Sequence, residues 1–154
     1  MKINTLIVVL SFLCLGLSAQ NTDAEFKKAK AEIEATYGFF PQVFDIIPDY
    51  QVPGMWAYFK TVNSPTNAIP LKYRELINLA VAAQIPCDYC IYYHTEAAKA
   101  YGATDDEVSE AIVTASSTRA FSMIIQGNQV KLEEFKEEFQ QMMAYMAKQA
   151  AEKK

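Results

Sequence analysis

The sequence lacks the positive charge that a nucleic-acid-binding protein needs. Its 154 residues include 14 Lys and Arg against 18 Asp and Glu, for a formal net charge of -4, and no block of basic residues occurs. Neutralising a run of phosphates takes clustered Lys and Arg, so we expect no binding to nucleic acid. The hydrophobic fraction of 51% and the charged fraction of 21% are typical of a globular protein.

Long apolar runs are also scarce, and the one present covers residues 6–17. A run of about twelve apolar residues is too short to span a bilayer, which takes roughly 20, and it is typical of the core of a signal peptide. Lys2 precedes the run, and small residues follow it up to Ala19. We therefore predict a signal peptide over residues 1–19, export to the periplasm or the cell exterior, and no stable membrane insertion. A buried N-terminal helix or strand is the alternative.

The remaining chain, residues 20–154, is predicted to form one all-α domain, because no convincing strand, repeat or low-complexity tract occurs. Capping residues, prolines and apolar periodicity place the helix boundaries. The predicted helices cover residues 21–38, 54–62, 69–85, 86–102, 104–127 and 131–154, with short helical turns between Pro41 and Pro53. Gly38 and Gly102 suit helix ends, and Thr104 with Glu107 has the spacing of a capping box.

Two of these helices carry informative apolar patterns. From Leu76 to Ala83 the chain is almost wholly apolar, which predicts a helix buried on most sides. The last helix has an apolar stripe at steps of three and four residues. Such a stripe more often belongs to the chain's own core, although its length and methionines leave an oligomer contact open. The stripe consists of Leu132, Phe135, Phe139, Met142 and Met146.

The scarcest side chains gather in one segment, "IPCDYCIYYH", which holds two of the three cysteines and the only histidine. On a helix that starts near Pro86, Cys87, Cys90 and His94 lie at steps of three and four and therefore share a face. Backbone N–H groups in the first turn stabilise an anion, so a C-x-x-C here favours a thiolate. A neighbouring histidine can take up the proton. The segment thus predicts a redox cycle through a sulfenic acid or mixed disulfide to an intramolecular disulfide.

Three other interpretations of the segment stay open. A structural disulfide is one, although a three-residue loop removes little entropy from the unfolded chain. A zinc site with His94 and Glu75 is the second, although it lacks the second cysteine pair usual in structural sites. A buried histidine without a catalytic role is the third.

The stretch "ELINLAVAAQIPCDYCIYYHTEAAKAYGATDDEVSEA" resembles the core of the alkylhydroperoxidase D-like proteins, within the carboxymuconolactone decarboxylase superfamily. The shared pattern is a glutamate on an apolar helix, C-x-x-C-x-x-x-H, a small-residue helix, a glycine turn and an acidic capping segment. It covers about residues 71–115. The resemblance implies an all-helical bundle that forms homotrimers or homohexamers, without a cofactor or metal.

The resemblance also implies the roles of four residues. Glu75, Cys87, Cys90 and His94 match a Glu-Cys-His proton relay around a peroxide-reducing dithiol, in which Cys90 attacks the peroxide and Cys87 closes the disulfide. Glu75, flanked by Leu76 and Ile77, is expected to be partly desolvated, whereas without the resemblance a surface glutamate paired with Lys72 or Arg74 would be the simpler expectation.

We therefore predict a thiol-dependent peroxidase or disulfide oxidoreductase that acts on a small hydroperoxide with a thiol or disulfide redox partner. One rival is a lyase like the carboxymuconolactone decarboxylases, which do not rely on C-x-x-C. The other is a non-catalytic helical binding protein whose disulfide is static. Tyr92, Tyr93 and Tyr101 are expected to pack against neighbouring helices and are given no catalytic role.

Overall fold

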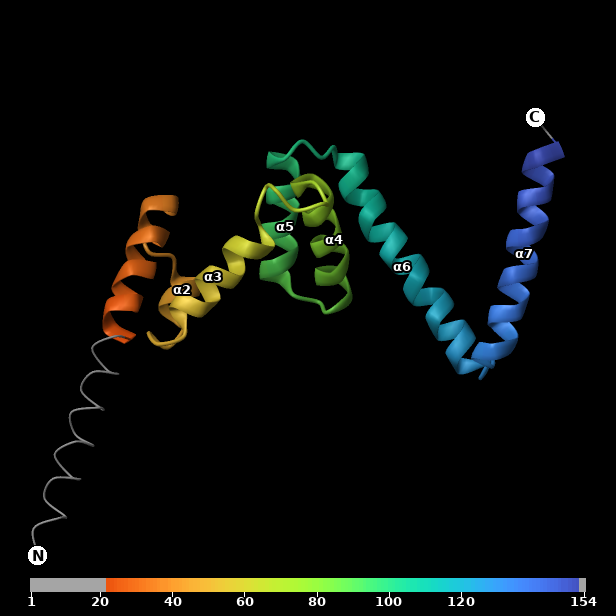
Figure 1. Ribbon diagram of the computed structural model, residues 1–154, viewed down its shortest axis with the longest axis horizontal. Helices are drawn as coiled ribbons and strands as arrows, with labels where there is room; N and C mark the ends of the chain where they lie inside the picture. Colours follow the sequence, from red (N-terminus) through yellow and green to blue (C-terminus); the bar gives the residue numbers. More distant parts are fainter. Residues whose placement is uncertain (1–21, 153–154) are drawn as a thin grey trace, which may run out of the picture. The chain divides into compact units, whose positions relative to one another are not determined.

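Helices make up nearly all of the regular structure in the computed structural model, which describes residues 22–152 and has no strand in that range (Figure 1). The all-α prediction is confirmed. The predicted signal peptide and Cys14 lie outside the described residues. Within those residues, no helix is long and apolar enough to cross a membrane. The chain divides into two compact units between Ala68 and Ile69, and each unit is described by itself.

The first unit consists of a helix over residues 22–37, the short α2 (Gln42–Asp45) and α3 (Val52–Val62). Gly38 ends the first helix as predicted, with φ of 80° in the left-handed region that glycine adopts without strain. Helix α3 begins two residues earlier than predicted. Pro53 fits its first turn, because the N–H that proline lacks would have no helical partner there.

The core of the first unit is apolar and largely aromatic. The ring of Phe44 meets that of Trp56 edge-on at 5.7 Å between centroids, and Phe59 stacks on Trp56 at 5.6 Å. The Trp56 indole N–H donates to Glu32 Oε2 at 3.0 Å, so its one polar atom is paired. The buried residues are Ala29, Ile33, Phe44, Val52 and Trp56, with Phe26, Phe40, Ile47 and Phe59 packed against them.

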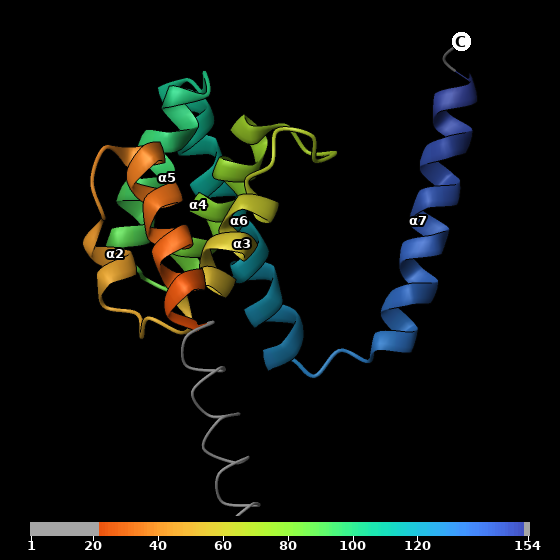
Figure 2. The ribbon, with the colours of Figure 1, turned by 60° about the vertical axis from the view of Figure 1, so that its left-hand side comes forward.

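The second unit consists of α4 (Leu71–Gln84), α5 (Asp88–Ala100), α6 (Asp105–Gly127) and α7 (Leu132–Glu152). Helix α4 packs against α5 and α6, and α4 and α5 lie side by side in Figures 1 and 2. Pro70 stands just before α4 as its N-terminal cap residue.

The buried part of the second unit is small. Its buried side chains are Leu79 and Ala82 of α4, Ala98 of α5, and the charged Glu75. The prediction that α4 is buried on most sides is wrong, since Ile77 is 50% exposed and Val81 is 53% exposed. One face of α4 meets α5 and α6, and an almost wholly apolar sequence does not reveal which face that is.

Helix α6 begins with the predicted capping box. Glu107 N–H donates to Thr104 Oγ1 at 3.1 Å, and Thr104 N–H donates to Glu107 Oε2 at 2.9 Å. Lys72 at the start of α4 donates to Glu107 Oε1 at 2.7 Å, which ties α4 to the start of α6. This Lys72 ammonium, together with the Thr104 N–H, lowers the pKa of Glu107, and the same contact raises the pKa of Lys72.

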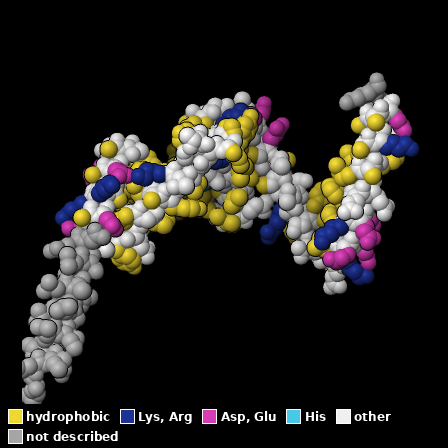
Figure 3. Space-filling model, viewed as in Figure 1, with side chains coloured by type: hydrophobic (Ala, Val, Ile, Leu, Met, Phe, Trp, Pro, Cys, Tyr) yellow, Lys and Arg dark blue, Asp and Glu magenta, His cyan; other side chains and the backbone are white. Residues whose placement is uncertain are grey.

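Helix α7 has no buried residue, and neither has α6. The interpretation of the α7 stripe as part of the chain's own core is therefore wrong for the described residues. Its apolar side chains follow one side of the helix, and its charged side chains lie elsewhere on it (Figure 3).

Candidate active site

Cys87 occupies the N-cap position of α5, one residue before the first turn in which it was predicted. The chain leaves α4 through a short turn, in which Cys87 N–H donates to Ala82 O at 3.2 Å. Cys87 has the extended backbone typical of a capping residue, and its Sγ accepts the N–H of Cys90 at 3.3 Å. The sulfur therefore takes the place that a Ser or Asp oxygen usually occupies at a helix start. This position stabilises negative charge on Cys87 once the thiol is free.

Cys87 and Cys90 are joined by a disulfide, with their Cα atoms 5.3 Å apart. Both residues are partly exposed. A reductant can therefore approach the sulfurs without a rearrangement of the fold. In this oxidised form neither sulfur is available as a thiolate ligand for zinc. Among the described residues, no group of three or more His, Cys, Asp and Glu side chains is placed to hold a metal ion.

Glu75 and His94 form a hydrogen bond between α4 and α5. Glu75 Oε2 lies 2.6 Å from His94 Nδ1, and Glu75 is 2% exposed while the His94 side chain is 22% exposed. The simpler expectation of a surface glutamate paired with Lys72 is wrong, because Glu75 is buried and Lys72 bonds Glu107. A buried carboxylate that is hydrogen-bonded to a partly exposed imidazole offers a route for a proton between the interior and the surface.

The four predicted site residues thus come together as two bonded pairs on α4 and α5. The disulfide joins Cys87 to Cys90, and the hydrogen bond joins Glu75 to His94. Cys90 and His94 lie four residues apart on α5, which places both on one face of that helix. The arrangement supplies a dithiol and a proton carrier at one location.

The tyrosines of this segment are more open than predicted. Tyr92 is 73% exposed, so the expectation that it packs against a neighbouring helix is wrong, whereas Tyr93 and Tyr101 are close to half exposed. The Tyr93 ring meets the His94 ring edge-on at 5.1 Å between centroids. Helical spacing contained the signal, because Tyr92 lies about 200° around α5 from Cys90 at 100° per residue. The number of aromatic side chains in the segment does not by itself give their directions around the helix.

Comparisons with known proteins agree with this architecture. The model of the carboxymuconolactone decarboxylase family matches residues 53–129, half of the chain. The chain belongs to the carboxymuconolactone decarboxylase family. A crystal structure of the alkylhydroperoxidase AhpD core from Rhodospirillum rubrum is similar, at 26% sequence identity and a TM-score of 0.63. The similarity covers 76% of this chain and 89% of that one. Among curated proteins, no match was found.

The alkylhydroperoxidase D-like resemblance inferred from the sequence is confirmed by these two matches. The family and the fold support an activity of the peroxidase or decarboxylase kind. The matched range includes both cysteines, Glu75 and His94, and ends before α7 begins at Leu132.

Proposed function

We propose that the protein is a thiol-dependent peroxidase in which Cys87 and Cys90 form the redox dithiol and Glu75 with His94 carries protons. The observation that supports this most is the joint geometry: an accessible disulfide at the start of α5, and a buried carboxylate bonded to a histidine on the same helix. A static disulfide would need neither the buried carboxylate nor the partly open imidazole.

In the first step, the Cys90 thiolate attacks the terminal oxygen of a hydroperoxide. The O–O bond breaks, the sulfur loses two electrons, and the products are a sulfenic acid on Cys90 and the alkoxide of the leaving group. His94, in contact with Glu75, supplies the proton that turns the alkoxide into an alcohol. Cys87 then attacks the sulfenic sulfur, the S–O bond breaks, and the disulfide forms with release of water.

Reduction of the Cys87–Cys90 disulfide completes the cycle, and the backbone N–H groups at the start of α5 assist it. A dithiol reductant attacks the Cys90 sulfur, and Cys87 leaves as a thiolate that the Cys90 N–H already contacts at 3.3 Å. A stabilised thiolate leaves faster in thiol–disulfide exchange. The second thiol of the reductant then displaces Cys90, so the reductant becomes a disulfide and both cysteines are free again.

Export to the periplasm or the cell exterior, and assembly into a homotrimer or homohexamer, are part of the same proposal. The apolar run over residues 6–17 supports export, and the family resemblance supports the assembly. N-terminal sequencing of the protein recovered from the producing cells tests the predicted cleavage near Ala19.

The central experiment exposes the reduced protein to tert-butyl hydroperoxide and follows free thiols and sulfenic acid. We expect the wild type to lose two thiols per chain with no lasting sulfenic acid. Cys87→Ser should accumulate a sulfenic acid on Cys90 that a 1,3-dione reagent labels. Cys90→Ser, the matched variant, should react at least about 100-fold more slowly, because it lacks the thiol that lies one turn from the histidine.

Other outcomes would refute specific parts of the proposal. Labelling of Cys87 in Cys90→Ser at the wild-type rate would exchange the roles of the two cysteines. A Cys87–Cys90 disulfide that resists dithiothreitol in the folded protein would favour the static disulfide. Decarboxylation of a lactone acid that continues unchanged in Cys90→Ser would favour the lyase.

A further inference from the structure

The apolar stripe of α7 faces no other part of the second unit. Each of its five members is between 40% and 59% exposed, and no residue of the helix is buried. Figure 3 shows hydrophobic side chains along one side of α7. The family match ends at residue 129, before this helix begins. The stripe consists of Leu132, Phe135, Phe139, Met142 and Met146.

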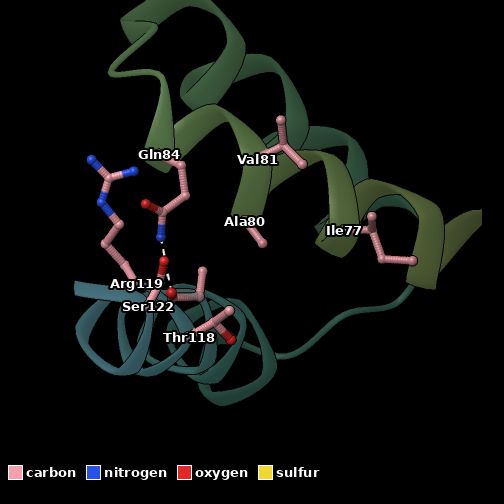
Figure 4. A pocket seen from close by; sticks show the side chains of 8 residues that line it. Ile77, Ala80, Val81, Gln84, Thr118, Arg119 and Ser122 are labelled. Carbon is pink, nitrogen blue, oxygen red and sulfur yellow. Dashed lines mark hydrogen bonds between the residues drawn. The ribbon is translucent and has the colours of Figure 1, made fainter. Parts of the chain in front are cut away.

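A second uncovered apolar surface lies between α4 and α6. It is a groove of about 440 Å³, and Figure 4 shows the side chains that line it. The small residues Ala80 and Ala115 contribute to it, and Gln84 Nε2 donates to Ala115 O at 2.9 Å at one end. Ile77 and Val81, which were expected to be buried, line the groove instead.

The two surfaces match in charge, and the groove fits part of the stripe in length, because Leu132 to Met146 covers about 21 Å of helix at 1.5 Å per residue. The groove follows α4 from Ile77 to Gln84, a length of about 10 Å at 1.5 Å per residue. The part of the stripe from Phe135 to Met142 has the same length along α7. Small side chains on α4 and α6 leave room for large side chains of another helix, as in ridges-into-grooves packing. Arg119 is the only charged residue that lines the groove. On α7, Glu138 flanks the stripe at the i−1 position of Phe139, and Glu134, at the i−1 position of Phe135, is paired with Lys131 at 2.8 Å.

We propose that α7 of each chain docks in the α4/α6 groove of a second copy of the chain. Within one chain the stripe and the groove are exposed at the same time, so the chain does not bring its own two surfaces together. A second copy covers both surfaces in one step, because each chain supplies one α7 and one groove to a reciprocal, self-complementary interface. Such a two-fold interface joins chains in pairs, so of the two assemblies proposed above it fits the homohexamer, as two trimers, and not a single homotrimer. Glu138 of each α7 then meets Arg119 of the other chain.

The test compares the mass of wild-type and variant proteins by size-exclusion chromatography with light scattering. Phe139→Glu places a charge in the stripe, and Ala144→Glu adds the same charge about 140° further around α7, on its polar side. Both residues are exposed within the chain, so neither variant disturbs its core. We expect Phe139→Glu to halve the mass of the assembly and Ala144→Glu to leave it unchanged. Val81→Glu in the groove should also halve the mass.

Each other result overturns the proposal. A wild type with the mass of one chain would show that α7 does not bind a second copy. A Phe139→Glu variant with the wild-type mass would show that the stripe is not in the interface. If Phe139→Glu halves the mass and Val81→Glu does not, α7 pairs with something other than the groove. The peroxide assay is run on the same samples. The groove lies on the face of α4 opposite Glu75, so variants that lose the assembly should keep the thiol reaction. A failure of this proposal is therefore distinguishable from a failure of the proposed function.

Discussion

The two units of the chain are both helical, but their interiors differ in kind. The first unit buries an aromatic cluster around Trp56 and Phe44, and every buried residue in it is apolar. The second unit buries no aromatic ring: its buried residues are Leu79, two alanines and one carboxylate, Glu75, which bonds His94. Large rings supply stability through buried area, whereas small side chains let helices approach closely and leave room for a polar pair.

This difference separates stability from chemistry within one small protein. The residues with the largest buried apolar surface lie in a unit that has none of the proposed catalytic residues. The unit with the dithiol and the Glu75–His94 pair has little apolar surface of its own to bury. It follows that changes in the first unit should act on folding, and that changes in the second should act on reaction rate more than on folding.

The largest expected effect on stability comes from Trp56→Ala. Removing a buried indole creates a cavity and deletes the ring contacts with Phe44 and Phe59, so we expect the free energy of unfolding to fall by about 4 kcal/mol. Urea unfolding followed by circular dichroism measures it. The rate of thiol oxidation by tert-butyl hydroperoxide, measured without denaturant on the folded fraction, should stay within about twofold of wild type, and a loss comparable to that of Cys90→Ser would contradict the separation of roles.

His94→Ala should have a smaller effect on folding and a larger effect on rate. It removes the hydrogen bond between His94 and the buried Glu75 carboxyl, which costs about 2 kcal/mol of stability. It also removes the proton donor, so peroxide-dependent thiol oxidation should slow by at least about 100-fold. Stopped-flow kinetics and urea unfolding on the same samples measure both.

Glu75→Gln is the matched control for that variant. The amide can keep a hydrogen bond to His94 but cannot exchange a proton as a carboxyl does. We therefore expect stability close to wild type together with a rate as slow as that of His94→Ala. A rate close to that of the wild type in Glu75→Gln would mean that the pair only holds the two helices together.

Much of the fold and the site followed from local sequence signals, because these signals report on the backbone directly. Gly38, Pro53 and the Thr104–Glu107 box each act within one helical turn, and the helix ends occur at or near the predicted positions. The spacing of Cys87, Cys90 and His94 likewise refers to one helix. The pairing of Glu75 with His94 joins two helices and was expected only through the family resemblance.

Burial was predicted less well, because it depends on which elements exist to cover a face. The stripe on α7 and the apolar run of α4 have the composition of core segments, yet Phe139 and Val81 remain about half exposed. A sequence of one chain gives the periodicity of an apolar face but does not show whether the same chain or a second copy covers it. The α7 stripe and the exposed face of α4, whose burial was wrongly predicted, are also the surfaces on which the proposed docking of α7 depends.

The smallest expected effect is on the pH dependence of the free energy of unfolding, and it arises in the second unit. Lys72 and the Thr104 N–H lower the pKa of Glu107 in the folded chain. A carboxyl with a lower pKa in the folded state than in the unfolded state binds fewer protons when folded, so its contribution to stability is present above the unfolded pKa. The contribution is then lost as pH falls through the folded pKa.

Urea midpoints measured from pH 7 to pH 3 for the wild type and Glu107→Gln test this. The difference between the two proteins should be largest at pH 7 and should shrink as the wild-type carboxyl becomes protonated. Because Lys72 has a raised pKa, its side of the contact stays charged throughout this range and adds no slope of its own. Glu110→Gln, on the same helix but outside the capping box, is the control and should follow the wild-type profile. A Glu107→Gln profile parallel to the wild type at every pH would mean that Glu107 stabilises the start of α6 through its shape alone.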